Sequence, residues 1–311
     1  MSFRWKYGLP LLLGISTMYL ESCTKEIDVG LPPFDAQIQM EGYVNDTLPL
    51  FNYIVLNRSV DYFDPNLSAI GVPGAQVTVE EGERVDGGDT VWGRRWELQE
   101  APLDELLPDD DSLQAAANTL PTFYIDPSLS WIGKPGKLYR ATVIKDADTL
   151  VAVTRIPAQE VALDSLTYEL ELTNDTLRGL VKYHFQEPPT QGNYYRVQAI
   201  KALRLDPFNP GPGQFFGWGN FTIDFVVSDE SVNGEYRSLT TPLEIAVDDS
   251  ITAFLNHIDR ASYEYWESFF NARDNGGPFA QPIQLKSNVR GGLGVFTGIN
   301  ASFIDTVVQK P

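Results

Sequence analysis

The chain has 311 residues and a formal net charge of −19, from 42 acidic and 23 basic side chains. This negative charge disfavours nucleic acid and anionic lipid as partners. Hydrophobic residues make up 43% of the sequence, which argues against a disordered chain, and the length allows one large or two ordinary domains.

A short apolar run near the N-terminus predicts a leader. Arg4 and Lys6 precede residues 8–19, a run with the length of a signal-peptide core. It is too short to cross a hydrocarbon layer of about 30 Å as a helix. Leu-Glu-Ser-Cys follows at 20–23 and contains the only cysteine of the chain, Cys23, which has no partner for an intrachain disulfide.

The segment 20–23 resembles a bacterial lipobox. The resemblance implies that residues 1–22 are a signal peptide, that Cys23 carries the lipid anchor, and that residues 23–36 are a lipidated tether. Charged residues at 24–28 resemble the export signal of surface lipoproteins of Bacteroidetes. We therefore expect a lipid-anchored protein on the outer membrane, facing the cell exterior. The alternative is an ordinary secretory signal followed by a free thiol.

Alternating apolar and polar residues predict β-strands in the first half of the chain. The expected strands are residues 37–44, 53–60, 74–80, 92–98, 137–144 and 149–156. Pro-Gly-Ala-Gln-Val-Thr-Val at 73–79 resembles a strand of carboxypeptidase-regulatory-like and transthyretin-like sandwiches. The acidic stretch 101–122 lacks the ligand spacing of a calcium loop and reads as a solvated loop. We predict an antiparallel β-sandwich domain over 37–156.

Proline at 157 directly follows a predicted strand and marks the predicted domain boundary. A second series of strands is expected at residues 166–172, 177–185, 194–205, 221–227, 243–247 and 251–258. Asn-Tyr-Tyr-Arg-Val-Gln-Ala at 193–199 resembles a strand of fibronectin-type or immunoglobulin-like domains. The fold class is thus mainly β, with a second antiparallel β-sandwich domain over 157–311.

One short C-terminal helix is predicted over residues 260–272, with Asp259 as its N-cap. Aromatic residues recur along it at spacings of three and four, which gives the helix one aromatic face. They are Tyr263, Trp266, Phe269 and Phe270. Such a stripe is more typical of core packing than of a cofactor site. Beyond the helix, residues 291–296 and 302–308 predict a closing hairpin around 298–300.

Four segments carry a family likeness. They are Glu-Gly-Tyr-Val at 41–44, Tyr-Glu-Tyr-Trp-Glu-Ser-Phe at 263–269, Gly-Pro-Phe-Ala-Gln-Pro at 277–282 and Ser-Asn-Val-Arg-Gly-Gly-Leu-Gly-Val-Phe at 287–296. Together they resemble domain-of-unknown-function family 4249, whose members are Bacteroidetes lipoproteins. The resemblance implies an accessory role beside a TonB-dependent outer-membrane receptor, and it supplies no catalytic residues. Alternatively, the glycines at 291–294 only permit tight backbone turns.

Two aromatic loops are candidates for a binding surface, because aromatic side chains are enriched where a protein grips a partner or a sugar ring. Loop 61–74 carries Tyr62 and Phe63, and loop 206–219 carries four more. Those four are Phe208, Phe215, Phe216 and Trp218. For the second loop, a covered structure folded over the end of the sandwich is the alternative.

No catalytic or metal-binding constellation stands out in the sequence. His184 and His257 lie in separate predicted strands without a ligand neighbour at metal-site spacing, so we predict no metal and no cofactor. The sequence has no Gly-x-Ser-x-Gly elbow and no phosphate-binding glycine loop. A pair of carboxylates would suit a glycosidase, but nothing in the pattern nominates a pair.

Aspartate followed by threonine or serine and an aliphatic residue recurs along the chain, as at 46–48, 148–150 and 175–177. The pattern matches the O-glycosylation acceptor of exported Bacteroidetes proteins, and Thr47, Thr149 and Thr176 are our candidates. The alternative is turn chemistry, since aspartate and threonine are common where strands begin.

We therefore predict a non-enzymatic surface lipoprotein that helps a TonB-dependent receptor to capture or admit a nutrient. Its other contacts would be outer-membrane lipid, through the acyl anchor, and a glycan or peptide ligand. A stand-alone adhesin or glycan-binding module is the second hypothesis. A hydrolase is the third.

Overall fold

The computed structural model describes residues 34–61, 70–101, 120–173, 176–202, 222–275, 281 and 283–310. The chain divides into two compact units, Met1–Asp35 and Ala36–Pro311. Only Phe34 and Asp35 of the first unit are among the described residues. The predicted signal peptide and the predicted lipidation site, Cys23, therefore lie outside the described residues. The second unit contains all the elements presented below.

The second unit is mainly β, as predicted. Its strands in the first half of the chain are β1 (Ile38–Asn45), β2 (Tyr53–Arg58), β3 (Gln76–Arg84), β4 (Thr90–Glu100), β5 (Thr122–Ile125), β6 (Leu138–Lys145) and β7 (Asp148–Arg155). Those in the second half are β8 (Ser165–Tyr168), β9 (Glu171–Thr173), β10 (Thr176–Gln186), β11 (Tyr194–Ala202), β12 (Ile223–Ser228), β13 (Tyr236–Ala246), β14 (Ser250–Ile258), β15 (Val289–Arg290) and β16 (Leu293–Val307). The described residues contain one α-helix, α4 (Arg260–Asp274), and a 3-10 turn, η1 (Pro49–Phe51).

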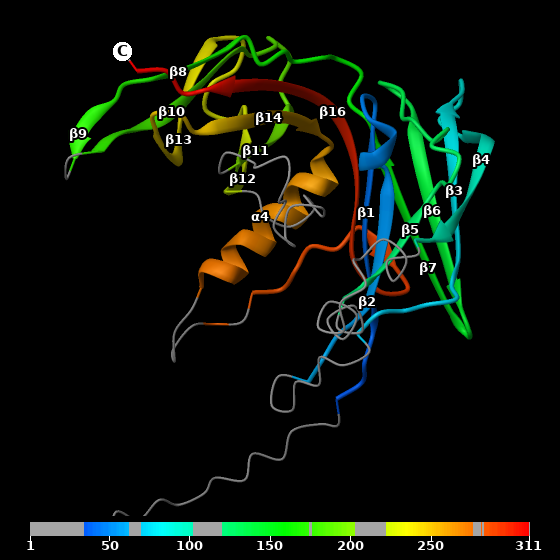
Figure 1. Cartoon of the computed structure of the whole chain (residues 1–311). Coiled ribbons are helices and arrows are strands. Elements are labelled where there is room, and N and C mark those ends of the chain that lie inside the picture. Colours follow the sequence, from blue (N-terminus) through cyan, green and yellow to red (C-terminus); the bar gives the residue numbers. More distant parts are fainter. Residues whose placement is uncertain are drawn as a thin grey trace, which may run out of the picture. The chain divides into compact units, whose positions relative to one another are not determined.

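Twelve strands form one sheet, in the order β12-β11-β14-β16-β1-β2-β5-β4-β3-β6-β7-β15 (Figure 1). A second sheet has the order β13-β10-β8, with β9 paired to β10. The large sheet therefore runs through strands from both halves of the chain. It joins them at β1, which pairs with β2 in antiparallel fashion and with β16 in parallel fashion.

Strand β16 corrects one prediction. The hairpin expected around residues 298–300 is wrong, because β16 is one continuous strand of 15 residues, the long curved red strand of Figure 1. Its first part pairs with β1 and its second part with β14. Gly298 is a point of close approach: its N–H donates to Thr154 Oγ1 at 2.7 Å, and a Cβ there would lie 2.7 Å from the Arg155 carbonyl. Glycine is needed for this contact with β7 and not for a turn.

Buried apolar side chains form three clusters. The first core cluster is drawn mainly from residues 38–156, with Met40 and Trp131 fully buried. The second is drawn from residues 161–308, with Val197 and Leu255 among its buried members. Period-two alternation of the strands produces both clusters. The division into two sandwich domains at residue 157 stays a prediction.

The third core cluster gathers around α4, which contacts the sheet mainly at β11, β12 and β16. Trp266 and Phe270 of the stripe are buried and lie in this cluster with Tyr43 and Tyr53. The predicted core-packing role of the stripe is therefore confirmed. Asp259 is the N-cap, as predicted, since its side chain accepts a hydrogen bond from the Ser262 N–H. The described part of the chain has no helix with the length and apolar character required to cross a membrane.

Candidate functional site

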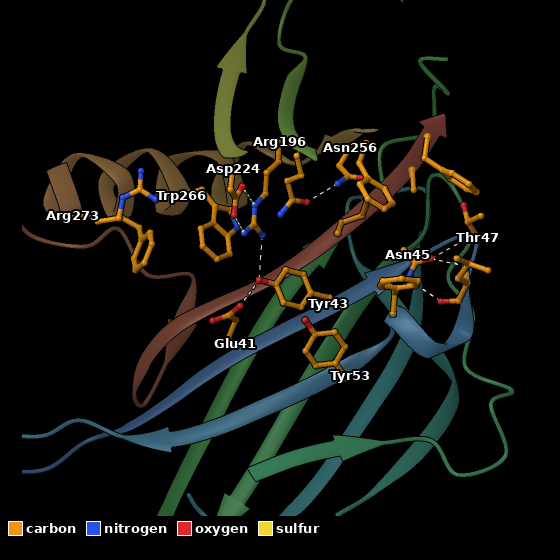
Figure 2. A pocket seen from close by; sticks show the side chains of 18 residues that line it. Glu41, Tyr43, Asn45, Thr47, Tyr53, Arg196, Asp224, Asn256, Trp266 and Arg273 are labelled. Atoms are coloured by element: carbon orange, nitrogen blue, oxygen red, sulfur yellow. Dashed lines mark hydrogen bonds and ion pairs between the residues drawn. The ribbon is translucent and has the colours of Figure 1, made fainter. Parts of the chain in front are cut away.

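A pocket of about 390 Å³ lies over the large sheet (Figure 2). Its lining comes from six strands that are consecutive in the sheet, β12, β11, β14, β16, β1 and β2, and from α4 and the η1 region. The pocket thus forms where the two halves of the chain join.

Strand alternation explains why β1 contributes polar side chains to the pocket. Glu41, Tyr43 and Asn45 are every second residue of the strand and line the pocket. Met40 and Val44 alternate with them and are buried in the first core cluster. One face of β1 therefore builds the core, and the other builds the site.

Strand β11 follows the same rule. Arg196 and Gln198 line the pocket, while Val197 and Ala199 belong to the second core cluster. Arg196 and Gln198 are only 5% and 4% exposed. A charged side chain this deeply buried requires a partner, because an uncompensated charge in the protein interior is strongly destabilising.

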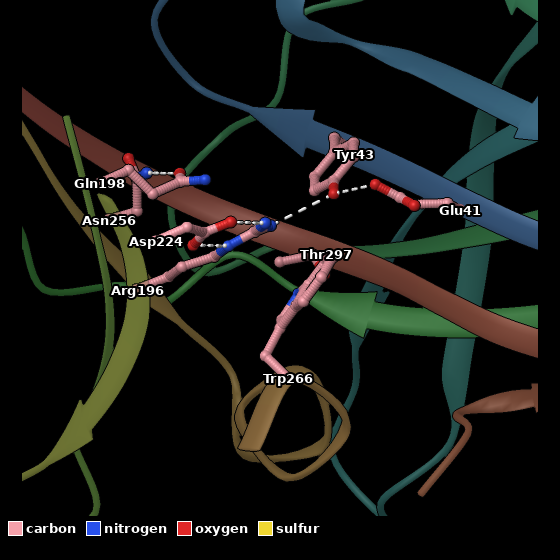
Figure 3. A network of polar contacts seen from close by, with 8 residues as sticks. All are labelled: Glu41, Tyr43, Arg196, Gln198, Asp224, Asn256, Trp266 and Thr297. Carbon is pink, nitrogen blue, oxygen red and sulfur yellow. Dashed lines mark hydrogen bonds and ion pairs between the residues drawn. The ribbon is translucent and has the colours of Figure 1, made fainter. Parts of the chain in front are cut away.

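Asp224 on β12 is the partner of Arg196. The Arg196 Nε donates to Oδ1 of Asp224 at 2.8 Å and Nη2 donates to Oδ2 at 2.6 Å, which makes a two-point ion pair (Figure 3). The Nη1 group donates to the Tyr43 hydroxyl at 3.2 Å. Burial works against the Arg196 charge, but these contacts with Tyr43 and Asp224 raise the pKa of Arg196 above its ordinary value. The guanidinium therefore stays a cation.

The guanidinium of Arg196 also lies over the Trp266 ring, with its central carbon 3.5 Å from the ring centroid. This cation–π contact joins β11 to α4. Trp266 is fixed on its other edge, where Nε1 donates to Thr297 Oγ1 at 3.4 Å. The arginine is thus held by an ion pair, a hydroxyl and an aromatic face.

Tyr43 links the arginine to Glu41, because its hydroxyl donates to the Glu41 carboxylate and accepts from Arg196. Burial raises the pKa of both Tyr43 and Tyr53 well above 10.0, and the Glu41 charge raises them further. Both side chains are therefore neutral phenols. Their ring centroids lie 5.1 Å apart, so they form one aromatic wall.

An amide pair lies beside the ion pair. Asn256 Nδ2 on β14 donates to Gln198 Oε1 at 2.9 Å, and Figure 3 shows the two amides facing each other. The described residues supply no other side-chain hydrogen bond to either amide. Both side chains line the pocket. The pair therefore brings an amide NH₂ group and a carbonyl oxygen, neither used in the bond between them, to the pocket lining.

The two histidines occupy separate strands, as predicted. Nε2 of His184 on β10 lies 2.6 Å from Thr167 Oγ1, and Nδ1 of His257 on β14 lies 3.0 Å from the Gln159 carbonyl. Burial lowers the pKa of His257. Across the described ranges, no three or more His, Cys, Asp or Glu side chains are grouped in a way that would hold a metal ion.

The family described as Domain of unknown function (DUF4249) matches residues 24–303. The chain belongs to this family. The match includes all the residues that line the pocket, from Glu41 to Phe303. No curated protein matches the DUF4249 chain.

Most site residues predicted from the sequence of the DUF4249 chain fall outside the described residues. They are Cys23, Tyr62, Phe63, Phe208, Phe215, Phe216 and Trp218. Strands β11 and β12, which flank residues 203–221, both line the pocket.

The three candidate threonines lie apart from one another in the sequence and on different elements. Thr47 is exposed at the pocket rim, and Thr149 is exposed on β7. Thr176 begins β10, and its side chain lies outside the described part. Their modification stays a prediction.

No sequence motif singles out Arg196, Asp224, Gln198 or Asn256. A signal was present, because Arg196 and Gln198 are alternate polar residues within the otherwise apolar run of residues 194–200. Such alternation indicates that one face of the strand carries polar side chains, and buried polar side chains require hydrogen-bonding or ionic partners. Their partners, Asp224 on β12 and Asn256 on β14, lie 28 and 58 residues further along the chain, and the sequence does not show which strands pair.

Proposed function

We propose that this DUF4249 protein is a non-enzymatic surface lipoprotein that binds a small ligand in the pocket and assists a TonB-dependent outer-membrane receptor in its uptake. The observation that carries the proposal is the fixed pocket between the two halves of the large sheet. Its volume of about 390 Å³ falls within the roughly 300–1,000 Å³ typical of small-molecule sites.

Preorganisation supports a binding role. Arg196 is held by Asp224, Tyr43 and Trp266 before any ligand enters. A site whose side chains are already ordered loses less conformational entropy when it binds, so more of the contact energy appears as affinity. The mixture of aromatic walls with a few placed polar groups is the usual composition of ligand sites.

Lipid anchoring is supported by the place of Cys23 directly after an apolar run with a basic start. Cells grown with labelled fatty acid should label the wild-type chain and leave Cys23→Ala unlabelled. Equal label on both chains, or no label on the wild type, would contradict the anchor.

The receptor is tested by isolating the protein from outer membrane in mild detergent. We expect a TonB-dependent receptor to be recovered with the wild-type chain and to be depleted with Cys23→Ala, because the anchor confines the two proteins to one surface. Repeated recovery of the wild-type chain alone would count against the accessory role.

A stand-alone adhesin or glycan-binding module is the second candidate. Exposed apolar residues beside the pocket favour it: Leu48, Leu50 and Phe303 are 42%, 62% and 40% exposed. Such residues are available to a partner surface. Binding of intact cells to a coated glycan surface, in a strain without the receptor, would favour the adhesin over the accessory.

We also propose that each half of the chain, 37–156 and 157–311, is a sandwich domain. We further propose that at least one of Thr47, Thr149 and Thr176 carries a glycan. Exposure of Thr47 and Thr149 supports this second proposal, since a modified hydroxyl must be accessible. An intact mass of the native protein equal to that of the bare lipidated chain would contradict it.

A further inference from the structure

The charges of the pocket are balanced before a ligand enters. Four charged residues line it, Glu41, Asp224, Arg196 and Arg273, and their formal charges cancel. Arg196 is engaged by Asp224, and Arg273 pairs with Asp274 at 2.9 Å. An anion would have to displace Asp224 from the buried guanidinium. Glu41 is different: only its Oε1 accepts from Tyr43, its side chain is exposed, and no salt bridge within the described residues engages it, so it can accept further hydrogen bonds from a ligand.

The two uncharged amides of the pocket, Gln198 and Asn256, do not use all their hydrogen-bonding groups on each other. The single hydrogen bond between Gln198 and Asn256 uses one of their four N–H donors and one carbonyl lone pair, so the Gln198 NH₂ group and the Asn256 carbonyl oxygen take no part in it. Exchanging oxygen and nitrogen in both amides leaves the same balance, so this conclusion does not depend on how the amides are oriented. Adjacent donor and acceptor groups complement a hydroxyl, which both donates and accepts.

Aromatic rings surround these polar groups. Tyr43 and Tyr53 form one wall, and Phe269 of α4 and the neighbouring residues Phe254 and Phe303 add further rings. Phe254 and Phe303 have centroids 5.9 Å apart on adjacent strands. A ligand with one apolar face and several hydroxyls would satisfy both kinds of surface.

We propose that the pocket binds an uncharged sugar, a neutral mono- or disaccharide, with its hydroxyls on the Gln198–Asn256 pair and on Glu41 and its ring face on the aromatic wall. The inference rests on the proposed function and names the class of ligand. Anionic sugars are disfavoured, because Arg196, the buried cation of the site, is already paired with Asp224 and would have to leave that buried contact to compensate them.

The experiment titrates the purified, folded protein with a panel of glucose, galactose, mannose, N-acetylglucosamine, maltose, cellobiose and lactose, and follows heat by calorimetry. At least one neutral sugar should bind with saturation. Its uronic-acid counterpart should bind at least tenfold more weakly. Absence of saturable binding by every neutral sugar, or tighter binding of the uronic acid, would overturn the proposal.

A variant pair locates the binding. Gln198→Leu combined with Asn256→Leu removes both amides together and leaves neither one unpaired. We expect at least a tenfold loss of affinity. Gln76→Leu, the same change on an exposed residue of β3 outside this pocket, should bind as the wild type does. Equal affinity of the double variant and the wild type would overturn the assignment.

A measurement on the wild-type chain covers the case in which the double variant fails to fold. Monodeoxy analogues of the bound sugar each lack one hydroxyl, and at least one of them should lose tenfold or more in affinity. A uniform response to all analogues would contradict recognition through hydroxyls. Recovery of a receptor without sugar binding would reject only the ligand class, and sugar binding without a receptor would reject only the accessory role.

Discussion

Asp259, the N-cap of α4, also binds Thr154 of β7, whose hydroxyl donates to Asp259 Oδ2 at 2.8 Å. The same oxygen accepts the Arg155 N–H at 2.9 Å. Thr154 Oγ1 in turn accepts the Gly298 N–H of β16. One carboxylate therefore starts the helix and ties it to a strand from the other half of the chain.

Asp259→Ala should destabilise the protein by roughly 2–4 kcal/mol, because it removes the helix cap and leaves Thr154 and Arg155 without their acceptor. Urea unfolding followed by circular dichroism measures the loss. Asp274→Ala, at the exposed C-terminal end of the same helix, is the matched control and should cost less than about 1 kcal/mol. Equal losses in the two variants would contradict the linking role.

Arg196→Met should cost roughly 3–5 kcal/mol, since it leaves Asp224 unpaired in a largely buried site. Adding Asp224→Leu should recover part of the loss, because a buried pair replaced by apolar residues leaves no uncompensated charge. Arg178→Met removes an exposed ion pair with Glu244 and should change the free energy of unfolding by less than about 1 kcal/mol. Equal free energies of unfolding for Arg196→Met and Arg178→Met would contradict a stabilising role of the buried network.

Gly294→Ala should weaken the parallel pairing of β1 with β16. The φ angle of Gly294 is +118°, and a Cβ there would lie 1.9 Å from the Met40 carbonyl oxygen. Strain of this kind costs roughly 1–3 kcal/mol before the clash is counted. Gly93→Ala on β4 meets its nearest neighbour at 3.9 Å and should be nearly neutral. Thermal unfolding of both variants distinguishes a required glycine from a tolerated one.

Glu187 should make stability depend on pH. Its side chain is fully buried; Oε1 accepts from Asn193 Nδ2 and the Tyr195 hydroxyl, each at 3.1 Å, and Oε2 has no partner within the described residues. Burial raises the pKa of Glu187 above 4.5, the Asp229 charge raises it further, and the hydrogen bonds from Tyr195 and Asn193 and the charge of Arg237 oppose the rise. The folded protein therefore holds this proton more tightly than the unfolded chain does.

Because the folded state binds this proton more tightly, the contribution of Glu187 to the free energy of unfolding is fully present below pH 4.5. It is lost as the pH rises through the raised pKa of Glu187 in the folded state. Urea unfolding between about pH 4 and pH 8 should show a steeper loss for the wild type than for Glu187→Gln, which carries no titrating proton. Glu171→Gln, on an exposed residue of β9, should keep the slope of the wild type. Parallel curves for the wild type and Glu187→Gln would contradict the prediction.

The sequence predicted most of the strands, because their alternation is a local property. The strand predicted over residues 37–44 is β1, Ile38–Asn45, the strand predicted over 251–258 falls in β14, and Asp259 caps the helix as expected. The short strands β5 and β15 were not predicted. The prediction of a closing hairpin was wrong because it assigned Gly298 to a turn. Gly298 instead lies against the backbone of Arg155, and no local sequence pattern indicates this close contact.

The site was less predictable than the strands. Trp266 was recognised in the aromatic stripe and correctly placed in a core, but its contact with Arg196 depends on how α4 lies over β11. Arg196, Asp224 and Asn256 meet only because β11 pairs with both β12 and β14. The order in which strands pair is a property of the whole sheet. A site whose residues come from several paired strands is therefore hard to recognise in the sequence alone.

The parallel pairing of β1 with β16 has a consequence for how the chain folds. Gln39 pairs with Leu293, so β1, the first strand in the chain, pairs with a strand that lies about 250 residues further along the sequence. Contacts this distant in sequence form slowly, since a long loop has to close before they stabilise anything. Until residues 293–299 are in place, the edge of β1 that pairs with β16 has no partner in this sheet, and an unpaired strand edge favours aggregation.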